Sequence, residues 1–564
     1  MSFIVKQPKG GGNTHVYIVK SHHIPKLKQG RQKREYLGVL ALDGCELLLG
    51  VRTPEPTPAV LAMLAKSNIN YNGRMAGLPG PKTSRAMRTD GTAAVLIETG
   101  RTDALTLMAV EFGLSAALSS AFGAEDGTRL LGLAMHQACE SSPSYMAGDW
   151  LDGTSFGRRS GSLSASTVSR LLASIGSDIE AQSKFFRLWI DACGKPQALI
   201  HDTTSISTHA DRLTQAEWGY NRDKESLPQV NLALVCERGG RIPLWYRTIP
   251  GSVPDVATLQ TTCRIISDLG LADFSLSLDR GYFSETNLAE MTRARLGFVI
   301  GVPMSRAQAS ALVQKHKAAL ESTKQSFLHN GARLRHVPCK YEVKLPSGRM
   351  KQISAHLYLD TERRELLSRR FETSVIELEM KAAAKTLAKP FKNVGEAGEW
   401  IADNAGQLAK YLAPARLNGK AVVRRLDDAV ATASESMGYM LLLASNRKSG
   451  RDTVLSDYRC RDIAEKIFDT YKNATGNNRL RSGDDDGAAG RVFVAFIATI
   501  LHCLAERRLT QAKAKTHSVR EALNLLVKIK TLRHANGRVI ALEIPRKTKD
   551  IFDILTNKGT RNAK

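Results

Sequence analysis

The sequence is poor in acidic residues relative to basic ones. Its 564 residues include 55 Asp+Glu against 80 Lys+Arg, which gives a formal net charge of +25. This excess favours a polyanionic partner, and nucleic acid is the commonest. A membrane surface is the alternative, but we find neither a basic amphipathic helix nor a lipid-attachment signal. The hydrophobic share of 43% indicates a globular protein.

The sequence also lacks close cysteine pairs and an apolar leader. Its eight cysteines are scattered, with no pair at the spacing of zinc ligands, which indicates reduced thiols. The N-terminal stretch MSFIVKQPKGGG has no apolar core. The longest apolar run, VFVAFIATILHCLA from Val492, is too short to span a bilayer and contains His502. We therefore expect a soluble, cytoplasmic protein with no membrane partner.

The length predicts three or four domains. Residues 51–90 contain Pro, Gly and Arg without periodicity and are interpreted as a linker. Composition and periodicity divide the chain into six segments: a basic, strand-containing DNA-binding region with this linker (1–90), a helical DNA-binding or linking domain (91–194), the first part of an α/β core (195–302), an insertion (303–455), the second part of the core (456–510) and a basic C-terminal region (511–564).

Two stretches before residue 195 suggest DNA contacts. The strand patterns HVYIVKSHHI and EYLGVLALDG flank a basic stretch, and the first 40 residues hold eight Lys/Arg and one acid, Glu35. A hairpin that contacts phosphate and a solvated basic turn both fit this pattern. The stretch LSASTVSRLLASIG, Leu163–Gly176, resembles a helix-turn-helix recognition helix that would present Ser166, Thr167 and Arg170 to DNA. Serine caps before short helices are common, so this signal is weak.

After residue 194 the pattern changes to strands alternating with helices, which predicts a mixed α/β sheet. PQVNLALVCE and RIPLWYRTI are predicted to form a hairpin. Asp202 ends the strand QALIHD, and Asp279 ends the strand DFSLSLD. If these two strands lie side by side, their carboxylates converge in the crevice where ligands of α/β folds collect.

The stretch DYRCRDIAEKIFDTYKNATG predicts an amphipathic helix over Asp457–Gly476. Tyr458, Arg461, Glu465 and Lys472 would line one stripe about 60° wide. Taken alone, such a stripe is a solvated face with helix-supporting charge pairs.

Three converging carboxylates suit hard divalent cations, Mg²⁺ or Mn²⁺. Asp202, Asp279 and Glu465 are the candidates. Two ions about 3.5–4 Å apart would activate a water or a 3′-hydroxyl and stabilise the leaving oxygen at a phosphodiester. Each acid has a simpler alternative, because both aspartates could be turn residues and Glu465 a surface acid. Their order, strand, strand and helix within a basic chain, favours catalysis.

These residues together resemble a known family. The spacing Y-(2)-R-(3)-E-(6)-K of Tyr458, Arg461, Glu465 and Lys472 resembles the signature of DDE transposases from bacterial insertion sequences. IHDTTS and LDRGYFSETNL are similar to the two aspartate motifs of that family, and IPLWYRTIPGSVPDVATL to the stretch between them. The resemblance covers roughly residues 90–555.

The resemblance implies an α/β fold with an RNase H-like catalytic domain. A strand-containing insertion would interrupt this domain, a mainly helical region would precede it, and a basic helical tail would follow. The resemblance assigns Mg²⁺ or Mn²⁺, as two ions, to three carboxylates: Asp202, Asp279 and Glu465. It assigns the DNA backbone of the element's end to three other side chains: Tyr458, Arg461 and Lys472.

The function implied is that of a DNA transposase. It would cleave the ends of an insertion sequence and join the 3′-hydroxyls to target DNA, as a homodimer in a synaptic complex on double-stranded DNA at the bacterial nucleoid. Some relatives form a hairpin that needs a flipped base, and Trp400 is a candidate to stack on it, with a core tryptophan as the alternative. Two other functions stay open: an RNase H-like nuclease or resolvase without strand transfer, and a non-catalytic DNA-binding protein descended from a transposase.

Three further features are given structural interpretations. The acids of SGDDDG, Asp484–Asp486, are expected to favour the start of the next helix. Asp255 is interpreted as the first-turn acid or cap of the helix that follows it. His201 is expected to point to the opposite face of its strand from Asp202.

Overall fold

The computed structural model describes residues 2–9, 13–24, 29–40, 47–49, 53, 55–71, 94–514, 518–534 and 538–557. The chain divides into two compact units. The first comprises Met1–Leu96 with Leu532–Ile540, and the second comprises Ile97–Thr531 with Ala541–Lys564.

The first unit is built on a four-stranded antiparallel sheet in the order β1-β2-β3-β4. The strands are β1 (Ser2–Lys9), β2 (Asn13–Ile24), β3 (Gln29–Leu40) and β4 (Leu47–Leu49). The β2–β3 hairpin confirms both predicted strands, although part of the basic stretch between them lies outside the described residues. The linker interpretation of 51–90 is wrong in one part, because Pro58–Lys66 forms helix α1 and buries Leu64 against the sheet.

The second unit begins with the predicted helical region. Its helices are α2 (Gly100–Glu111), α3 (Leu114–Phe122), α4 (Ala124–Glu140), α5 (Ala147–Asp152), α6 (Gly157–Ser160), α7 (Ala165–Ser177) and α8 (Ile179–Ala192). Helix α7 starts at the predicted serine cap, where Ser164 Oγ accepts a hydrogen bond from Thr167 N at 3.2 Å. Ser166 and Arg170 on this helix are exposed.

A nine-stranded mixed sheet forms the centre of the second unit, in the order β11-β12-β13-β16-β10-β9-β6-β7-β8. The strands are β6 (Ala198–Ser207), β7 (Gln229–Glu237), β8 (Pro243–Pro250), β9 (Ser275–Leu278), β10 (Gly297–Val302), β11 (Ser326–His329), β12 (Ala332–Lys344), β13 (Met350–Asp360) and β16 (Tyr439–Ala444). Strands β6, β7 and β8 are antiparallel neighbours, whereas β9 runs parallel to β6 and β10 parallel to β9. This mixed sheet confirms the predicted α/β class and is consistent with an RNase H-like core.

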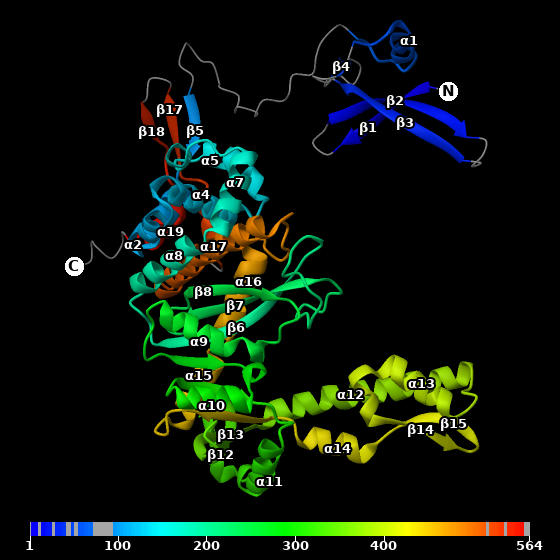
Figure 1. Cartoon of the computed structure of the whole chain (residues 1–564), viewed down its shortest axis with the longest axis vertical. Helices are drawn as coiled ribbons and strands as arrows, with labels where there is room; N and C mark the ends of the chain where they lie inside the picture. The colour runs from blue at the N-terminus through cyan, green and yellow to red at the C-terminus, as the bar shows by residue number, and fades with distance from the viewer. Residues whose placement is uncertain are drawn as a thin grey trace. The chain divides into compact units, whose positions relative to one another are not determined.

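Helices cover this sheet. The chain crosses between its strands through α9 (Leu259–Asp268) and α10 (Glu285–Arg293), while α8 and α17 (Asp485–Gln511) pack against β8 (Figure 1). By length and composition α17 could cross a membrane, but 89% of its apolar window is buried inside the protein. Its surroundings are therefore those of a core helix.

Residues 303–455, assigned to an insertion, contribute to two parts of the structure. Strands β11, β12, β13 and β16 extend the main sheet, and β12 and β13 form a hairpin around Pro346-Ser347-Gly348. The remaining elements include α11 (Ala307–Glu321), α12 (Thr361–Ala388), α13 (Val394–Ala405), β14 (Leu412–Leu417), β15 (Lys420–Arg425) and α14 (Asp427–Glu435). Elements from α12 to β15 pack around a separate core (Figure 1). Trp400 packs against that core, which favours the core alternative for this residue.

The rest of the chain consists of helices and short strands. After the main sheet come α15 (Arg451–Arg459), α16 (Asp462–Asp469), the π-helical segment Thr470–Ala474, α17, α18 (Val519–Leu526), β17 (Lys530–His534), β18 (Val539–Ala541) and α19 (Arg546–Thr556). A small sheet has the order β18-β17-β5, with β5 at Ala94–Glu98. Only part of the basic tail is helical, because α18 ends at Leu526 and β17 follows.

Candidate active site

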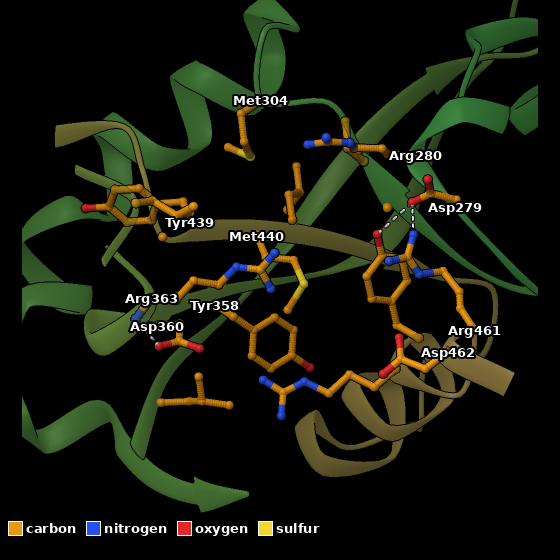
Figure 2. A pocket seen from close by; sticks show the side chains of 18 of the residues that line it. Asp279, Arg280, Met304, Tyr358, Asp360, Arg363, Tyr439, Met440, Arg461 and Asp462 are labelled. Carbon is orange, nitrogen blue, oxygen red and sulfur yellow. Dashed lines mark hydrogen bonds and ion pairs between the residues drawn. The ribbon is translucent and has the colours of Figure 1, made fainter. Parts of the chain in front are cut away.

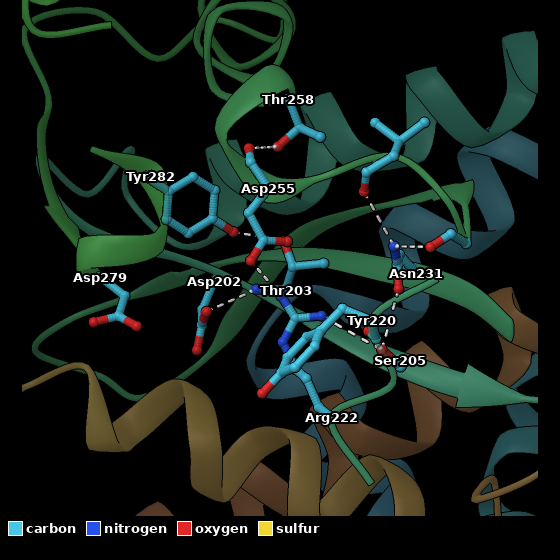
Figure 3. A network of polar contacts seen from close by, with 12 residues as sticks. Asp202, Thr203, Ser205, Tyr220, Arg222, Asn231, Asp255, Thr258, Asp279 and Tyr282 are labelled. Atoms are coloured by element: carbon cyan, nitrogen blue, oxygen red, sulfur yellow. Dashed lines mark hydrogen bonds and ion pairs between the residues drawn. The ribbon is translucent and has the colours of Figure 1, made fainter. Parts of the chain in front are cut away.

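Asp202 and Asp279 lie next to each other on the central sheet. The parallel ladder between β6 and β9 ends at the pair His201–Leu278, so the two aspartates follow at the next step of the register. Figure 3 shows their carboxylates side by side. The expectation that the first strand ends at Asp202 is wrong, because β6 continues to Ser207 through its pairing with β7. This continued pairing fixes the backbone on both sides of Asp202.

Burial raises the pKa of Asp202 to about 7, and the nearby charges of Asp279 and Asp255 act in the same direction. Two groups favour the charged form: the backbone N–H of Thr203, 2.8 Å from Asp202 Oδ1, and the guanidinium of Arg222. Neighbouring groups therefore balance only part of the negative charge of Asp202 in this buried position. An additional cation would stabilise it.

A third acid, Asp255, belongs to the same polar network (Figure 3). It lies in the first turn of a 3₁₀ helix, as predicted, but its carboxylate also forms an ion pair with Arg222. Arg222 reaches Ser205 Oγ on β6 at 3.4 Å, and Tyr282 Oη bonds with Thr203 Oγ1 at 2.5 Å. No motif or periodic pattern indicated Arg222, because it lies in the long β6–β7 connection, far from the motifs in the chain.

The signature residues do not lie on one helix, so the predicted helix Asp457–Gly476 is wrong. Tyr458 lies in the last turn of α15, Arg461 directly precedes α16, Glu465 lies in α16, and Lys472 lies in the π-helical segment. The expected C-terminal end is confirmed: Gly476 follows the π-helical segment with φ +73°.

Short-range hydrogen bonds close the break between α15 and α16. Arg461 N donates to Tyr458 O at 3.3 Å, and Ile463 N donates to Cys460 O at 2.9 Å. Such i to i+3 bonds tighten the chain relative to an α-helix and turn the following segment. The break therefore changes the angle at which Tyr458 and Glu465 leave the backbone relative to a continuous helix.

Tyr458 and Arg461 both bind Asp279. Tyr458 Oη donates to Asp279 Oδ1 at 3.2 Å, and Arg461 forms an ion pair with the same oxygen. Burial of the hydroxyl raises the pKa of Tyr458 to about 12, so it remains protonated and acts as a donor. Gly301 on β10 leaves room for this hydroxyl, because a Cβ there would lie 2.6 Å from Tyr458 Oη.

A cavity of about 590 Å³ connects Asp279 with Glu465 (Figure 2). Both acids line it, and so do Arg461 and three further arginines: Arg280, Arg363 and Arg459. The side chain of Glu465 is 63% exposed and lies 4.0 Å from Arg461 Nη2. The cavity thus places the third acid beside the second in an arginine-rich space that suits an anionic substrate.

Lys472 lies apart from the three acids. Its Nζ is 2.6 Å from Asp223 Oδ2 in the β6–β7 connection, and only 11% of its side chain is exposed. The structure therefore brings Tyr458, Arg461 and Glu465 to the cavity beside Asp279, and it places Lys472 against a neighbouring loop.

The donor set fits a hard divalent cation only in part. Asp202 and Asp279 provide adjacent carboxylate oxygens, and the poorly compensated charge of Asp202 favours a bound cation. Within the described ranges, however, no three Asp, Glu, His or Cys side chains are close enough together to hold a metal. Arg461 at present occupies one oxygen of Asp279, and Glu465 lines the cavity. Side-chain movement of both would be needed to complete a three-carboxylate site.

The interpretation of the SGDDDG acids is confirmed. Asp484 caps α17, with its Oδ1 accepting a hydrogen bond from Gly487 N at 2.6 Å. His201 is buried against the Tyr282 ring, and its Nδ1 lies 3.1 Å from Leu234 O. Burial lowers the pKa of His201 to about 4. This histidine is therefore neutral and structural.

The sequence also matches a known family. A family model described as the transposase DDE domain matches residues 194–501, more than half of the chain, and the chain therefore belongs to this family. A solved structure of the piggyBac transposase synaptic complex with hairpin DNA is similar with a TM-score of 0.36 and 10% identity, over 78% of this chain and 72% of that one. No curated protein matches the sequence.

Proposed function

We propose that this protein is a DNA transposase of a bacterial insertion sequence. It would bind the ends of the element, cleave them by divalent-metal-dependent phosphodiester hydrolysis and join the 3′-hydroxyls to target DNA. The observation that carries the proposal is the adjacency of Asp202 and Asp279, with Glu465 on the cavity beside them, in a chain of the DDE transposase family.

In this proposal Asp202, Asp279 and Glu465 hold Mg²⁺ or Mn²⁺, as two ions. The metal would activate the attacking oxygen and stabilise the leaving oxygen of the phosphodiester. In this structure Tyr458 donates a hydrogen bond to the Asp279 carboxylate and Arg461 forms an ion pair with it. When a cation takes their place at Asp279, both side chains become available to DNA phosphate oxygens. Lys472 would exchange Asp223 for a phosphate in the same way.

The same donors would serve an RNase H-like nuclease or resolvase, which would cleave without joining. A non-catalytic DNA-binding descendant is disfavoured by the presence of all three acids and of the complete Y-(2)-R-(3)-E-(6)-K spacing. The net charge of +25 supports double-stranded DNA as the partner. We place the protein in the cytoplasm, at the nucleoid, as a homodimer on paired element ends.

A transposition assay in cells tests the proposal. A selectable marker is placed between the DNA segments that flank the gene, where we expect short inverted repeats, and its movement to a second plasmid is counted. The wild type should move the marker, whereas Asp202→Ala, Asp279→Ala and Glu465→Ala should each abolish movement. Asp211→Ala, at an exposed acid of the β6–β7 connection, is the matched control and should stay active. Movement by any of the three variants would contradict the proposed site.

A further inference from the structure

A second cavity, of about 320 Å³, lies between the helical region and the segment that follows Glu465. Residues 141–145 after α4 form one wall, the π-helical segment and the residues after it form another, and the N-terminal part of α17 forms a third. Within the described chain, the residues that line this cavity include no carboxylate and three arginines: Arg479, Arg481 and Arg491. The cavity has room for a small anion.

Arg491 is the arginine that most needs a partner. It lies half-buried on the apolar helix α17, between the buried residues Gly490 and Val492, and its Nη1 donates to Ser144 Oγ at 3.4 Å. It forms no ion pair with a residue of the described chain. Burial lowers the pKa of Arg491, while the charge of Asp484 acts against this. A guanidinium in such a position lacks a counter-ion that a bound anion would supply.

The two other arginines differ in their pairing. Arg479 is paired with Glu225 at 2.5 Å, whereas Arg481 is exposed and forms no ion pair within the described ranges. Neither Glu225 nor Asp484 lines the cavity, and Asp484 Oδ1 accepts the capping hydrogen bond from Gly487 N. The three arginines still outnumber these two acids.

The remaining acids near the cavity are directed elsewhere. Glu140, at the end of α4, forms an ion pair with Arg101 at 2.7 Å. Asp485 and Asp486 line a different cavity, and Asp485 Oδ1 accepts a hydrogen bond from Thr214 N at 2.9 Å. The wall of the cavity is therefore positively charged, which favours an anionic ligand.

Hydrogen bonds between the walls hold the cavity open. Ser141 Oγ donates to Ala474 O at 2.6 Å, and Gln137 Nε2 donates to Asn477 Oδ1 at 2.8 Å. Gly476, with φ +73°, lies so close to the first wall that a Cβ would be 2.9 Å from Ser141 O. The site is thus preformed, and a ligand meets little ordering cost there.

The donor groups of the cavity suit phosphate oxygens. Arginine presents parallel N–H donors that match the oxygens of a phosphate group. The hydroxyl groups of Ser144 and Tyr145 line the same cavity, and Tyr145 is 63% exposed. Guanidinium and hydroxyl donors on facing walls can contact different oxygens of one tetrahedral anion.

The cavity lies on the same face of β6 as Asp202. Ile206 lines it, four residues after Asp202 on a strand that pairs with β7 without a register shift. Residues four apart on a strand point to the same face and are separated by roughly 13 Å. A backbone phosphate of DNA bound at Asp202 could therefore reach the cavity, as could a free phosphate from solution.

We propose that Arg491, with Arg481 and Ser144, binds a phosphate group in this cavity, apart from the three carboxylates. A free phosphate and a DNA backbone phosphate present the same oxygens, so both are sources that the test must distinguish. The inference goes beyond the proposed function, because the cavity uses neither the acids nor a metal.

Binding of radiolabelled inorganic phosphate to the full-length protein tests the site, by equilibrium dialysis in chloride buffer with EDTA. The wild type should bind phosphate saturably. Arg491→Met and Arg481→Met should each weaken binding at least about tenfold, since each removes a charge-assisted hydrogen bond. Arg349→Met is the matched control, at an exposed arginine of the β12–β13 turn that forms no ion pair within the described chain, and it should bind like the wild type.

Thermal melting separates a ligand site from a structural role of Arg491. In phosphate-free buffer Arg491→Met should melt no lower than the wild type, because methionine keeps the packing of the side-chain stem and removes an unpaired charge. Added phosphate should raise the melting temperature of the wild type and of Arg349→Met, but not that of Arg491→Met. A large drop for Arg491→Met without phosphate would assign the guanidinium a structural role and overturn the proposal.

A short duplex identifies the source of the phosphate. For a DNA backbone phosphate, the duplex should displace labelled phosphate, and Arg491→Met should lower the slope of log duplex affinity against log salt by about one. For a free phosphate, both ligands should bind together and the slope should stay unchanged.

Two results would overturn the phosphate site. One is binding of labelled phosphate by Arg491→Met at the wild-type level. The other is a wild type that binds no phosphate, together with an unchanged salt slope of duplex binding in Arg491→Met. These measurements need neither a metal nor the element ends, so their outcome is separate from that of the transposition assay.

Discussion

At the scale of the residue, Asp202 is the most constrained group of the candidate site. Its pKa is raised from 3.8 to about 7, mainly by burial. An acid with a raised folded-state pKa lowers stability as pH rises from about 4 to 7, because the unfolded chain releases the proton first. Asp202→Asn should therefore increase the free energy of unfolding by about 2–4 kcal/mol at pH 8 and change it little at pH 4.

Urea denaturation in metal-free buffer at both pH values measures this difference. Asp211→Asn, at an exposed acid of the same connection, serves as the control and should have no effect at either pH. If Asp202→Asn were less stable than the wild type at pH 8, neighbouring groups would already balance the charge of the Asp202 carboxylate in the folded protein. In that case it would have no need of a cation.

Gly301 is a second residue with a defined role. A methyl group there would collide with Tyr458 Oη, which must then leave Asp279. Gly301→Ala should lower the cleavage rate at least about tenfold, because a loss of about 1.4 kcal/mol in positioning is enough for that. Gly450→Ala is the matched control, since a Cβ there meets open space. A rate for Gly301→Ala equal to that of Gly450→Ala would show that the placement of Tyr458 against Gly301 plays no part in cleavage.

Residue types and spacing predicted part of this site. Asp202 and Asp279 follow apolar strands, and the register of β6 and β9 brings them together as expected. Arg222 and Asp255 were not predicted as neighbours of Asp202, because the folding of a long connection joins them and no periodic pattern records it. The contacts of Tyr458 and Arg461 with Asp279 were also missed, since they depend on the angle between two elements.

At the scale of the element, the break between α15 and α16 is the main departure from the predicted pattern. The 3.6-residue period over Asp457–Gly476 is real, but Arg461 and Ile463 form i to i+3 bonds in place of a continuous ladder. Tertiary contacts of Tyr458 with Asp279 and Gly301 compete with local helix propensity there. The periodicity of the sequence predicted the strands and helices elsewhere in the core. It did not predict that β11–β13 extend the main sheet.

Helices α7 and α17 cross at unusually close range, and two glycines make this possible. A Cβ at Gly490 would lie 1.9 Å from Leu172 O, and one at Gly176 would lie 1.8 Å from Asp486 O. Gly490→Ala should destabilise the protein by about 1–3 kcal/mol through overpacking. Gly483→Ala, which has open space around it, is the control in thermal melting. An unchanged melting temperature for Gly490→Ala would show that the two helices separate at little cost.

At the scale of the whole molecule, the net charge of +25 favours contacts with DNA phosphates, and the number of phosphates neutralised sets how binding responds to salt. A protein that neutralises about four phosphates loses about a hundredfold in affinity between about 50 and 200 mM salt. We expect at least this loss for duplex DNA in fluorescence anisotropy.

The same titration tests Lys472. Lys472→Met should reduce the slope of log affinity against log salt by about one. Lys317→Met, at another lysine that is ion-paired, with Glu435 at 2.8 Å, should leave the slope unchanged. An unchanged slope for Lys472→Met would mean that this lysine keeps its pairing with Asp223 on DNA.

In the proposed function, Asp202, Asp279 and Glu465 form one metal-dependent site for DNA cleavage and joining. The most direct measurement uses purified protein, Mg²⁺ and a duplex that carries the element end. It follows strand cleavage and joining for the wild type and for Asp202→Ala, Asp279→Ala and Glu465→Ala. We predict cleavage and joining by the wild type, lost with EDTA and in all three variants while duplex binding is retained. Cleavage by Glu465→Ala at the wild-type rate would contradict the three-carboxylate site.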